Sequence, residues 1–456
     1  MKKTPCVLLV LVLLVGLCAC SGPESTPKQS VPPAAGKLTA KALNSGFPLS
    51  HDTYNGLSPA SNGKIYYVLC SESLDTGVQM YSYDPASDKI EHLGDLTEAS
   101  GEKGMKAIPK AKSHVWFYEA NGKLYFATHV DFYTVKGGRE LMGVPPAGYK
   151  QYPGGHFLSY DMATGKFENL AKAPPDQGII SMTMDAQRGR LYGVTWANGY
   201  FLRYDLASKE MKNLGPISHQ GEAGTGPTYR TLCRSLVVDP GDGSVYFTNS
   251  DGQFLRYRYD KDAIEIVAGE DLKKDYFGTY DPTSPVHMGY NWRQAVWYAP
   301  EKAIYAVHGN SGYLFRFDPH VPQVDVLERI TSEPSKRSGM FDKFYYGYLG
   351  FNLGPDGRTL YYLTGGPIIV NGKRVIARNV EQVGAKGDED LHLVTYDIPS
   401  GKYMDHGAIF CADGGRPSYV NSIAVGKDGS VYMLARITEN GKTRTDLVKI
   451  PAPPLK

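Results

Sequence analysis

Two histidines and two arginines are the residues of this sequence whose types and spacing could support catalysis. His114 and His129 lie on either side of a predicted hairpin turn at Asn121-Gly122. An imidazole exchanges a proton near neutral pH, so it can act as a general acid or base. Arg234 and Arg293 carry guanidinium groups, which bind carboxylates through paired hydrogen bonds. Together these side chains suit proton transfer next to a bound acidic group.

A sequence repeat explains how residues so far apart could meet. Seven segments share a short apolar strand, a turn with Gly, Asp or Asn, and a second strand with a tyrosine soon after the turn. A second pattern, as in MYSYDPASDKIEHL and FLRYDLASKEMKNL, follows most of these hairpins. Each unit therefore predicts a four-stranded antiparallel sheet, which must pack against copies of itself to bury both faces. The aligned tyrosines are Tyr66, Tyr125, Tyr192, Tyr246, Tyr305, Tyr361 and Tyr432.

The repeat predicts an all-β fold, a seven-bladed β-propeller with four-stranded antiparallel blades. The last unit is truncated at DLVKIPAP, so we expect residues 37–48 to complete the final blade. The extra length of the units lies in expected loops at 131–153, 218–228, 270–290 and 330–346. Cys70, Cys233 and Cys411 show neither a disulfide framework nor zinc-site spacing, so we expect small buried side chains there.

In a propeller the first strand of each blade lines the channel, and its start lies at the same end as the end of the second strand. Counting from the aligned tyrosines therefore gives the residues expected at that end. Those of the first strands are Asn55, His114, Ser181, Arg234, Arg293, the region of Leu349 and Gly350, and Asn421. Those of the second strands are Cys70, His129, Trp196, Asn249 or Ser250, His308, Thr364 and Arg436.

This constellation favours an acidic sugar as ligand. Asn55, Arg234, Arg293, Asn421 and Arg436 are expected to bind it through polar contacts. Aromatic side chains that could stack on sugar rings are Trp196, Tyr200, Trp292 and Tyr348. No cofactor is expected. A metal shared by His114, His129 and His308 is an alternative, but no Asp or Cys of the predicted ring supports it.

The chemistry that fits these residues is β-elimination. The ring shows no obvious pair of facing carboxylates, which ordinary glycosidases require. In a uronic acid the C5 proton lies next to a carboxylate, and arginines that neutralise that carboxylate make the proton more acidic. A His or Tyr can then remove the proton while a second group protonates the oxygen that leaves C4.

Several segments resemble the seven-bladed propeller carbohydrate enzymes of gut and marine bacteria. KSHVWFYEANGKLYFATH, YPGGHFLSYDMATGKFENL and YRTLCRSLVVDPGDGSVYF are among them, and the resemblance spans about residues 45–450. These enzymes include the ulvan lyases and the enzymes that act on L-rhamnose-α-1,4-D-glucuronate caps of arabinogalactan proteins, once classed as glycoside hydrolase family 145. The resemblance implies a polysaccharide lyase whose partner is an acidic plant or algal glycan.

The same resemblance implies roles for single residues. Its two catalytic histidines match His114 and His129, and the arginine that neutralises the uronate matches Arg234. The tyrosine that acts as acid or base matches Tyr200, unless Trp196 takes that position. The rhamnose-releasing enzymes use one histidine near the N-terminus, on the opposite face. Only His51 matches it, although our count places His51 on the face of His114.

Three functions therefore stay open. The first is a lyase, with a hydrolytic α-L-rhamnosidase that uses His51 as its enzymatic alternative. The second is a non-catalytic surface protein that binds glycans, and the third is a scaffold for protein interactions, which is a common use of propellers.

The first 36 residues are expected to target and tether the chain. Lys2 and Lys3 precede an apolar stretch at 7–16, and LCAC at 17–20 resembles a lipobox with Cys20 as the lipidated residue. Residues 1–20 are thus a predicted signal peptide, 21–36 a flexible linker and 37–456 the propeller. We expect a monomer anchored by lipid to the outer membrane, in the periplasm or at the cell surface. The formal net charge of +2 gives no reason to expect a nucleic-acid partner.

Overall fold

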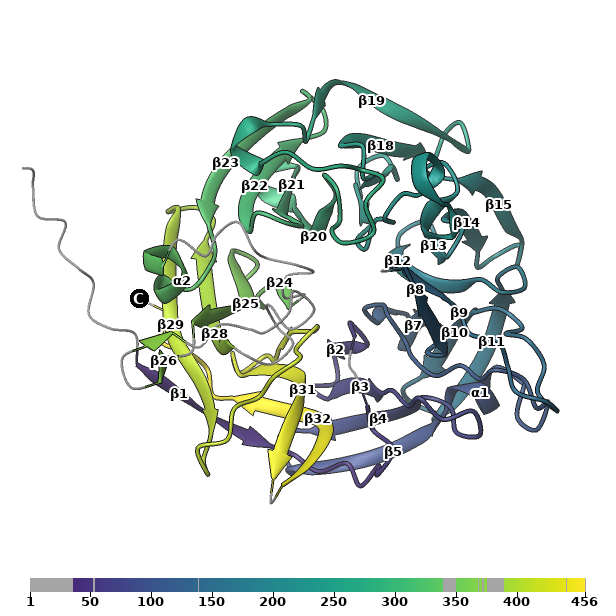
Figure 1. The fold of residues 1–456 in the computed structure, drawn as a ribbon, viewed down its shortest axis with the longest axis horizontal. Helices are drawn as coiled ribbons and strands as arrows, with labels where there is room; N and C mark the ends of the chain where they lie inside the picture. Colours follow the sequence, from purple (N-terminus) through teal and green to yellow (C-terminus); the bar gives the residue numbers. More distant parts are fainter. Residues whose placement is uncertain are drawn as a thin grey trace, which may run out of the picture. The chain divides into compact units, whose positions relative to one another are not determined.

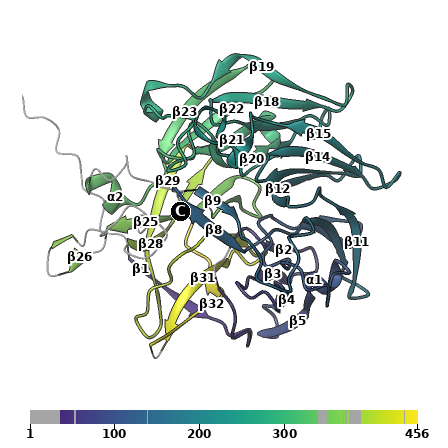
Figure 2. The same ribbon diagram turned by 45° about the vertical axis from the view of Figure 1, so that its right-hand side comes forward.

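The sequence repeats fold into four-stranded antiparallel sheets, and the protein is an all-β propeller. The computed structural model describes residues 36–51, 54–137, 139–338, 350–367, 369–370, 373–374, 389–439 and 441–455. Figure 1 shows the sheets side by side around a centre, with β2, β12, β20 and β24 nearest to it. Neighbouring inner strands contact one another, as β12 does β16 and β16 does β20. The turned view in Figure 2 shows the sheets that carry β14 and β18 next to each other.

Each of the first five sheets runs from an inner to an outer strand in chain order. The first consists of β2 (Leu57–Pro59), β3 (Ile65–Leu69), β4 (Gln79–Asp84) and β5 (Lys89–Asp95). The second consists of β6 (Tyr118–Ala120), β7 (Lys123–Ala127), β10 (His156–Asp161) and β11 (Lys166–Lys172). The third consists of β12 (Gly178–Asp185), β13 (Arg190–Trp196), β14 (Tyr200–Asp205) and β15 (Met211–Pro216).

The fourth sheet consists of β16 (Val237–Val238), β17 (Val245–Thr248), β18 (Gln253–Arg258) and β19 (Ala263–Asp271). The fifth consists of β20 (Trp292–Tyr298), β21 (Ala303–His308), β22 (Tyr313–Asp318) and β23 (Gln323–Arg329). The sixth consists of β24 (Phe351–Leu353), β25 (Thr359–Pro367), β28 (Glu389–Asp397) and β29 (Lys402–Cys411). The seventh consists of β30 (Ala424–Val425), β31 (Val431–Glu439), β32 (Lys442–Ile450) and the N-terminal β1 (Lys37–Ala42).

Strand β1 closes the ring, as the truncated last repeat predicted. Lys41 and Ala42 pair antiparallel with β32 and so complete the seventh sheet. Lys37 to Ala40 pair in parallel with β29 of the sixth sheet, so one strand joins the outer edges of two blades.

Short elements fill the long loops between strands. Those within or next to the four expected loops are the hairpin of β8 (Tyr133–Lys136) and β9 (Arg139–Met142), the 3-10 turns η1 (Gly221–Ala223), η2 (Gly226–Thr228) and η3 (Asp275–Phe277), and α2 (Glu333–Ser338). Elsewhere lie α1 (Leu96–Ala99), η4 (Ala299–Glu301) and the hairpin of β26 (Ile369–Val370) and β27 (Lys373–Arg374). No helix in the described ranges has the length and apolar character needed to cross a membrane.

The turn between the first two strands of a blade follows the predicted chemistry. In the second blade Asn121 and Gly122 both have positive φ, at 51° and 74°, which suits a tight hairpin. In the fifth blade Lys302 takes the left-handed conformation at φ 50°. A lysine can adopt it at modest cost here because the residue lies exposed at the turn.

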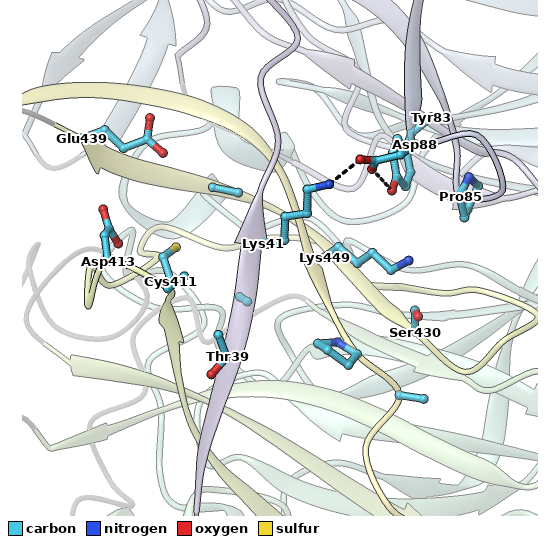
Figure 3. Close-up of a pocket in the computed structure, with 15 residues that line it drawn as sticks. Thr39, Lys41, Tyr83, Pro85, Asp88, Cys411, Asp413, Ser430, Glu439 and Lys449 are labelled. Carbon is cyan, nitrogen blue, oxygen red and sulfur yellow. Dashed lines mark hydrogen bonds and ion pairs between the residues drawn. The ribbon is translucent and has the colours of Figure 1, made fainter.

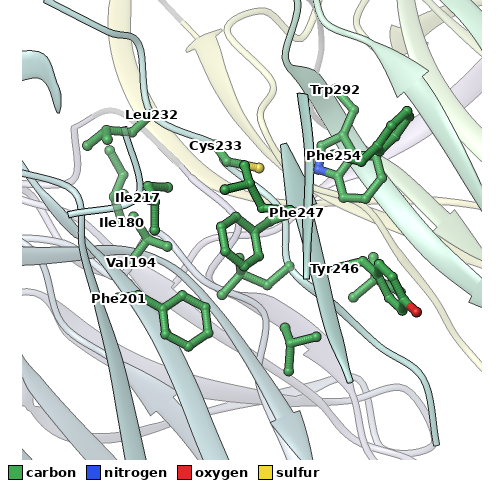
Figure 4. Close-up of a cluster of buried hydrophobic side chains, with 14 of the residues drawn as sticks. Ile180, Val194, Phe201, Ile217, Leu232, Cys233, Tyr246, Phe247, Phe254 and Trp292 are labelled. Atoms are coloured by element: carbon green, nitrogen blue, oxygen red, sulfur yellow. The ribbon is translucent and has the colours of Figure 1, made fainter. Parts of the chain in front are cut away.

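The core lies between the blades. All seven aligned tyrosines are buried on the second strands, as expected of side chains that face a neighbouring sheet. Figure 4 shows one such cluster, in which Phe201, Phe247 and Trp292 come from three successive blades. Nearby, the rings of Phe254 and Phe317 stack with centroids 3.8 Å apart. Each buried aromatic ring of this kind contributes roughly 1.5–3 kcal/mol of stability, so the packing between blades holds the ring together.

Hydrogen bonds also link the inner segments of neighbouring blades. The Tyr118 hydroxyl donates to the Met182 carbonyl at 2.9 Å, and Ser181 Oγ donates to the Cys233 carbonyl at 3.1 Å. The three body cysteines are buried and not disulfide-bonded, which confirms the expectation of small buried side chains. The two hydrogen bonds link the inner segments of the second, third and fourth blades.

Candidate active site

The structure brings His114 and His129 together at one end of the channel. Backbone hydrogen bonds between Lys112 and His129 join the two ends of the second-blade hairpin. The imidazole centroids lie 5.9 Å apart with an edge-to-face arrangement. The two side chains are buried, with only 5% of His114 and 1% of His129 exposed. The two imidazoles therefore lie against each other in a region shielded from solvent.

Both imidazoles are held neutral. Burial lowers the pKa of His114 well below its ordinary value, and the charges of Lys112, Arg234 and Arg293 add to the effect. Burial likewise lowers the pKa of His129 well below its ordinary value, with Lys112, His114 and Arg234 contributing. These effects also show that the predicted arginines lie close enough to act on the histidines. A neutral imidazole can accept a proton.

Lys112 is a site residue that the sequence reasoning missed. Its Nζ atom lies 3.2 Å from Asp131 Oδ1, and 3% of its side chain is exposed. The ammonium group also lies over the rings of Tyr54 and Tyr133, at 3.9 and 4.5 Å from their centroids. Cations bind aromatic faces in this way, more strongly when water is excluded. Its position two residues before His114 was the available signal, because residues two apart in extended chain face the same side.

The ring of Tyr54 lies 4.7 Å from that of His114, centroid to centroid, and Tyr133, at the start of β8, approaches His129. The Tyr133 hydroxyl lies 3.3 Å from His129 Nε2 and donates to the Val130 carbonyl at 2.6 Å. Since the hydroxyl proton is given to the carbonyl, the hydroxyl oxygen accepts from Nε2–H, which assigns the tautomer of His129. Burial raises the pKa of Tyr133 well above its ordinary value, with Asp131 and Glu140 adding to the rise. The phenol is therefore protonated at neutral pH.

Gly178 fixes the position of the His129 ring. A Cβ atom added at Gly178 would lie 1.9 Å from His129 Nδ1. The ring edge thus packs on the α-carbon of the first residue of β12. Within the described residues, Nδ1 of His129 and Nδ1 of His114 are buried without a hydrogen-bond partner.

Arg234 is oriented by Glu222, which lies in η1. Its Nη2 atom donates to Glu222 Oε1 at 2.6 Å, and Nη1 donates to the Leu232 carbonyl at 2.9 Å. The other oxygen of Glu222 accepts from the indole Nε1 of Trp196 at 2.9 Å. The hairpin β8–β9 also packs on η1, where Arg139 Nη1 donates to the Gly224 carbonyl at 2.5 Å. One buried carboxylate therefore positions the guanidinium group beside the histidines.

The other predicted polar residues take varied positions. Arg293 is 6% exposed, and its charge lowers the pKa of His114 and opposes the rise in that of Tyr362. The guanidinium group of Arg436 lies over the Tyr419 ring, 4.8 Å from its centroid. Asn421 is buried, and Asn55 lines a cavity of the channel.

The predicted stacking surfaces need correction. Trp292 is fully buried, its Nε1 donates to the Ser235 carbonyl at 2.9 Å, and its ring packs in the core between blades. Trp196 is 1% exposed and is covered by His129 and Tyr133 at its edges. Neither indole offers an exposed face to a sugar, because each fills space between blades.

Tyr200 lies apart from this arrangement, since its partly buried ring packs against the apolar cluster that contains Phe157 and Ile179. Tyr348 and Cys20 lie outside the described residues.

His51 lies at the same end of its blade as the histidine pair. Its backbone N–H donates to the carbonyl of Cys70, the residue after β3, at 2.9 Å. Its Nδ1 atom lies 3.1 Å from Glu72 Oε1, and the two side chains are 42% and 58% exposed. The pair is thus accessible, whereas His114 and His129 are enclosed.

His308 belongs to the packing of the fifth blade. Its ring stacks on Phe277 with centroids 4.4 Å apart, and its Nδ1 atom accepts from the Ser311 hydroxyl at 2.9 Å. Burial lowers the pKa of His308 to about 3. Across the described part of the chain, no three His, Cys, Asp or Glu side chains form a cluster that could hold a metal ion.

A cavity of about 870 Å³ lies beside β1, where the propeller closes, and none of the predicted catalytic residues lines it. Figure 3 shows Lys41 of β1 beside Asp88, with Nζ and Oδ2 2.5 Å apart. Asp88 also accepts from the Tyr83 hydroxyl at 2.7 Å. Lys41, Tyr83 and Asp88 thus bond to one another, and no histidine or arginine is among the described residues that line this cavity.

Comparisons with known proteins show the fold of this chain but identify no sequence family. No protein-family model matches the chain, and no curated protein matches it by sequence. A chain from the crystal structure of the mitotic checkpoint complex is similar with a TM-score of 0.50 and 10% identity, over 96% of this chain and 100% of that one. The β-propeller domain of Cps50 (Swd1) from Myceliophteria thermophila gives a TM-score of 0.51 and 8% identity, over 91% and 100%. At such low identity these matches show a β-propeller fold alone.

Proposed function

We propose that this protein is a carbohydrate lyase that cleaves an acidic glycan next to a glucuronate residue, with rhamnose-capped arabinogalactan or an ulvan-like glycan as its substrate. The supporting observation is the convergence of Lys112, Arg234 and Arg293 on two neutral imidazoles at one end of the channel. Guanidinium groups bind carboxylates through paired hydrogen bonds, so a cluster that contains two of them suits a carboxylate ligand.

The proposed proton transfers use groups already placed beside one another. His114 removes the C5 proton of the glucuronate while the cations stabilise the negative charge that develops on the carboxylate. The electron pair of the C–H bond forms the C4–C5 double bond, and the bond from C4 to the leaving oxygen breaks. Tyr133, protonated because of its raised pKa, donates its proton to that oxygen. After the products leave, the proton that His114 took returns to the Tyr133 phenolate, which restores both groups. His129 Nε2–H, 3.3 Å from the hydroxyl oxygen, donates a hydrogen bond to that phenolate meanwhile.

This proposal places Tyr133, rather than Tyr200, in the role of the acid. The hydroxyl of Tyr133 lies within reach of His129, whereas Tyr200 packs among apolar side chains of the second and third blades. Both tyrosines can lose their hydroxyl group with little change in volume, so they form a matched pair of variants.

The test is to incubate the purified protein with gum arabic and with ulvan and to follow ultraviolet absorbance. Elimination creates a double bond conjugated to the carboxylate, so absorbance should rise and unsaturated uronate ends should be found by mass spectrometry. Tyr133→Phe should lower kcat by about 10²–10⁴-fold, whereas Tyr200→Phe should leave it nearly unchanged. The reverse pattern would return the acid role to Tyr200.

A second candidate is a hydrolytic α-L-rhamnosidase that uses His51. It is favoured by the His51–Glu72 pair, whose side chains lie 3.1 Å apart and are accessible to a glycan end. Free rhamnose without any rise in absorbance, lost in His51→Ala and kept in His114→Ala, would support hydrolysis. Saturable binding of an acidic oligosaccharide without any product would instead support a surface glycan-binding protein.

We also propose that Cys20 carries a lipid that anchors the protein to the outer membrane. The LCAC segment after an apolar stretch supports this location. Metabolic labelling with a clickable fatty acid should label the wild-type protein and not Cys20→Ala. Labelling of both forms equally would reject the anchor.

A further inference from the structure

Next to the charged ring, which we define as Lys112, His114, His129, Arg234 and Arg293, the channel holds a cavity of different chemistry. Its volume is about 290 Å³. Trp116 lies two residues after His114, Ala295 lies two residues after Arg293, and both line the cavity.

The residues that line this cavity are all uncharged. Its polar groups are amides and hydroxyls, including those of Asn55, Gln294 and Asn352, while Trp116 and Trp297 supply aromatic surface. An ionised ligand would lose its hydration here without meeting an opposite charge among the lining side chains. The chemistry of the lining therefore selects a neutral molecule.

One lining group is buried without a partner. The Nε2 atom of Gln294 has no hydrogen bond within the described residues, although it is shielded from solvent. A buried amide donor without an acceptor is unfavourable, so a rotation of the side chain that turns Nε2 from its shielded position toward a ligand oxygen in the cavity would be stabilising. Gln294 directly follows Arg293, so this donor lies at the border between the charged ring and the neutral cavity.

The size of the cavity limits the occupant to one small ring. A water molecule takes about 30 Å³ of liquid volume, so the space equals about ten waters. Aromatic faces beside amide and hydroxyl groups are the pattern that small-molecule sites use to hold a ring with an apolar face and polar edges.

We propose that this cavity is a binding site for one neutral monosaccharide-sized polyol. Its hydroxyl groups accept from Gln294 Nε2 and bond to the neighbouring amides, while an apolar ring face lies against Trp116 or Trp297. The site does not depend on the elimination chemistry proposed for the charged ring, since none of its lining residues belongs to that ring.

The four tryptophans of the chain make the site directly measurable. Trp116 and Trp297 line the cavity and are partly exposed, whereas Trp196 and Trp292 are buried elsewhere. Titration with L-rhamnose, D-glucose or D-galactose should give a saturable change in tryptophan fluorescence and protect it from acrylamide quenching for at least one sugar. D-Glucuronate should give no such change in the double variant His114→Ala, Arg293→Gln, because the charged ring of that protein no longer attracts the carboxylate.

Gln294→Leu should weaken binding of the neutral sugar by about three- to tenfold, the value of one hydrogen bond. Gln323→Leu, a change at an exposed glutamine of β23, is the matched control and should bind as the wild type does. Circular dichroism spectra and melting curves identify a variant that fails to fold, and Thr183→Val is then the replacement within the cavity.

Two results would overturn the proposal: no saturable change with any of the three neutral sugars, or equal affinity in Gln294→Leu and the wild type. Either result would leave a channel that holds water only. If His114→Ala loses lyase activity but binds the neutral sugar as the wild type does, the neutral cavity is independent of the proposed lyase site. If the wild-type protein binds the sugar but shows no lyase activity, only the proposed lyase function is refuted.

Discussion

The charged ring and the cavity at the ring closure differ in how the protein treats charge. In the charged ring, solvent hardly reaches Lys112 and the two histidines, and it hardly reaches Asp131, the partner of Lys112. At the closure, Lys41 and Asp88 are each 55% exposed. Yet the cavity beside them, of about 870 Å³, is larger than the channel cavity of about 290 Å³ next to the charged ring. Water and salt screen the exposed pair, so its geometry has little consequence for energy.

The difference teaches that buried charge, rather than cavity size, indicates where chemistry is possible. Keeping cations and imidazoles in an enclosed space costs stability, and it shifts their pKa values strongly. The closure cavity has no such arrangement, since its ion pair of Lys41 and Asp88 is exposed to solvent. Variants of matched type in the two regions can break or sharpen this contrast.

The largest expected effect is on catalysis. His114→Ala removes the proposed base and should lower kcat on the glucuronate substrate by about 10²–10⁴-fold, since a positioned general base contributes that much. Asp88→Ala at the closure should leave kcat unchanged. Initial rates from ultraviolet absorbance measure both, and equal rates in the two variants would remove the charged ring from the mechanism.

The next effect is on stability. Lys112→Met removes one member of a buried ion pair with Asp131 and should cost about 3–5 kcal/mol of unfolding free energy. It should also raise the pKa of His114 and His129, because the lysine charge holds both down. Urea denaturation gives the free energy, and NMR titration of the imidazoles gives the pKa values. Lys41→Met is the control, and a loss of equal size there would contradict the contrast.

A smaller effect is expected from a single methyl group. Gly178→Ala places a Cβ where His129 Nδ1 now lies, so the ring must move, at a cost of about 1–3 kcal/mol. Gly36→Ala meets no atom within 4 Å and should change nothing. Urea denaturation and the chemical shifts of His129 report the two variants. An unchanged His129 signal in Gly178→Ala would show that the ring is not held there.

A further effect is a slope in the pH dependence of stability. His308 has a folded pKa of about 3, below the value of about 6.5 for an unfolded chain. Below pH 6.5 the unfolded state binds a proton that the folded state does not, so stability falls with falling pH until about pH 3. The loss is about 1.4 kcal/mol per pH unit for each such histidine. His308→Phe should reduce the slope between pH 6 and pH 4, and an unchanged slope would contradict the burial of a neutral imidazole.

The fold was accessible from the sequence because the repeat is local. Each hairpin, its turn residues and its tyrosine lie within one short segment, and the antiparallel hairpin then brings His114 and His129 to the same end of a blade. The closure by β1 followed from the missing strand of the last repeat. Counting from the tyrosines also carried Arg234 and Arg293 to that end, where their charges act on the histidines.

What the sequence determined by itself was therefore the repeat, the propeller and the end of the channel at which two imidazoles and two guanidinium groups meet. The tertiary structure alone decided that Tyr133 rather than Tyr200 approaches His129, and that Trp292 lies in the core. The reason is that an aromatic side chain looks the same in sequence whether it faces solvent or a neighbouring blade. The path of a loop such as the β8–β9 hairpin likewise depends on contacts with η1, which lies far away in the chain.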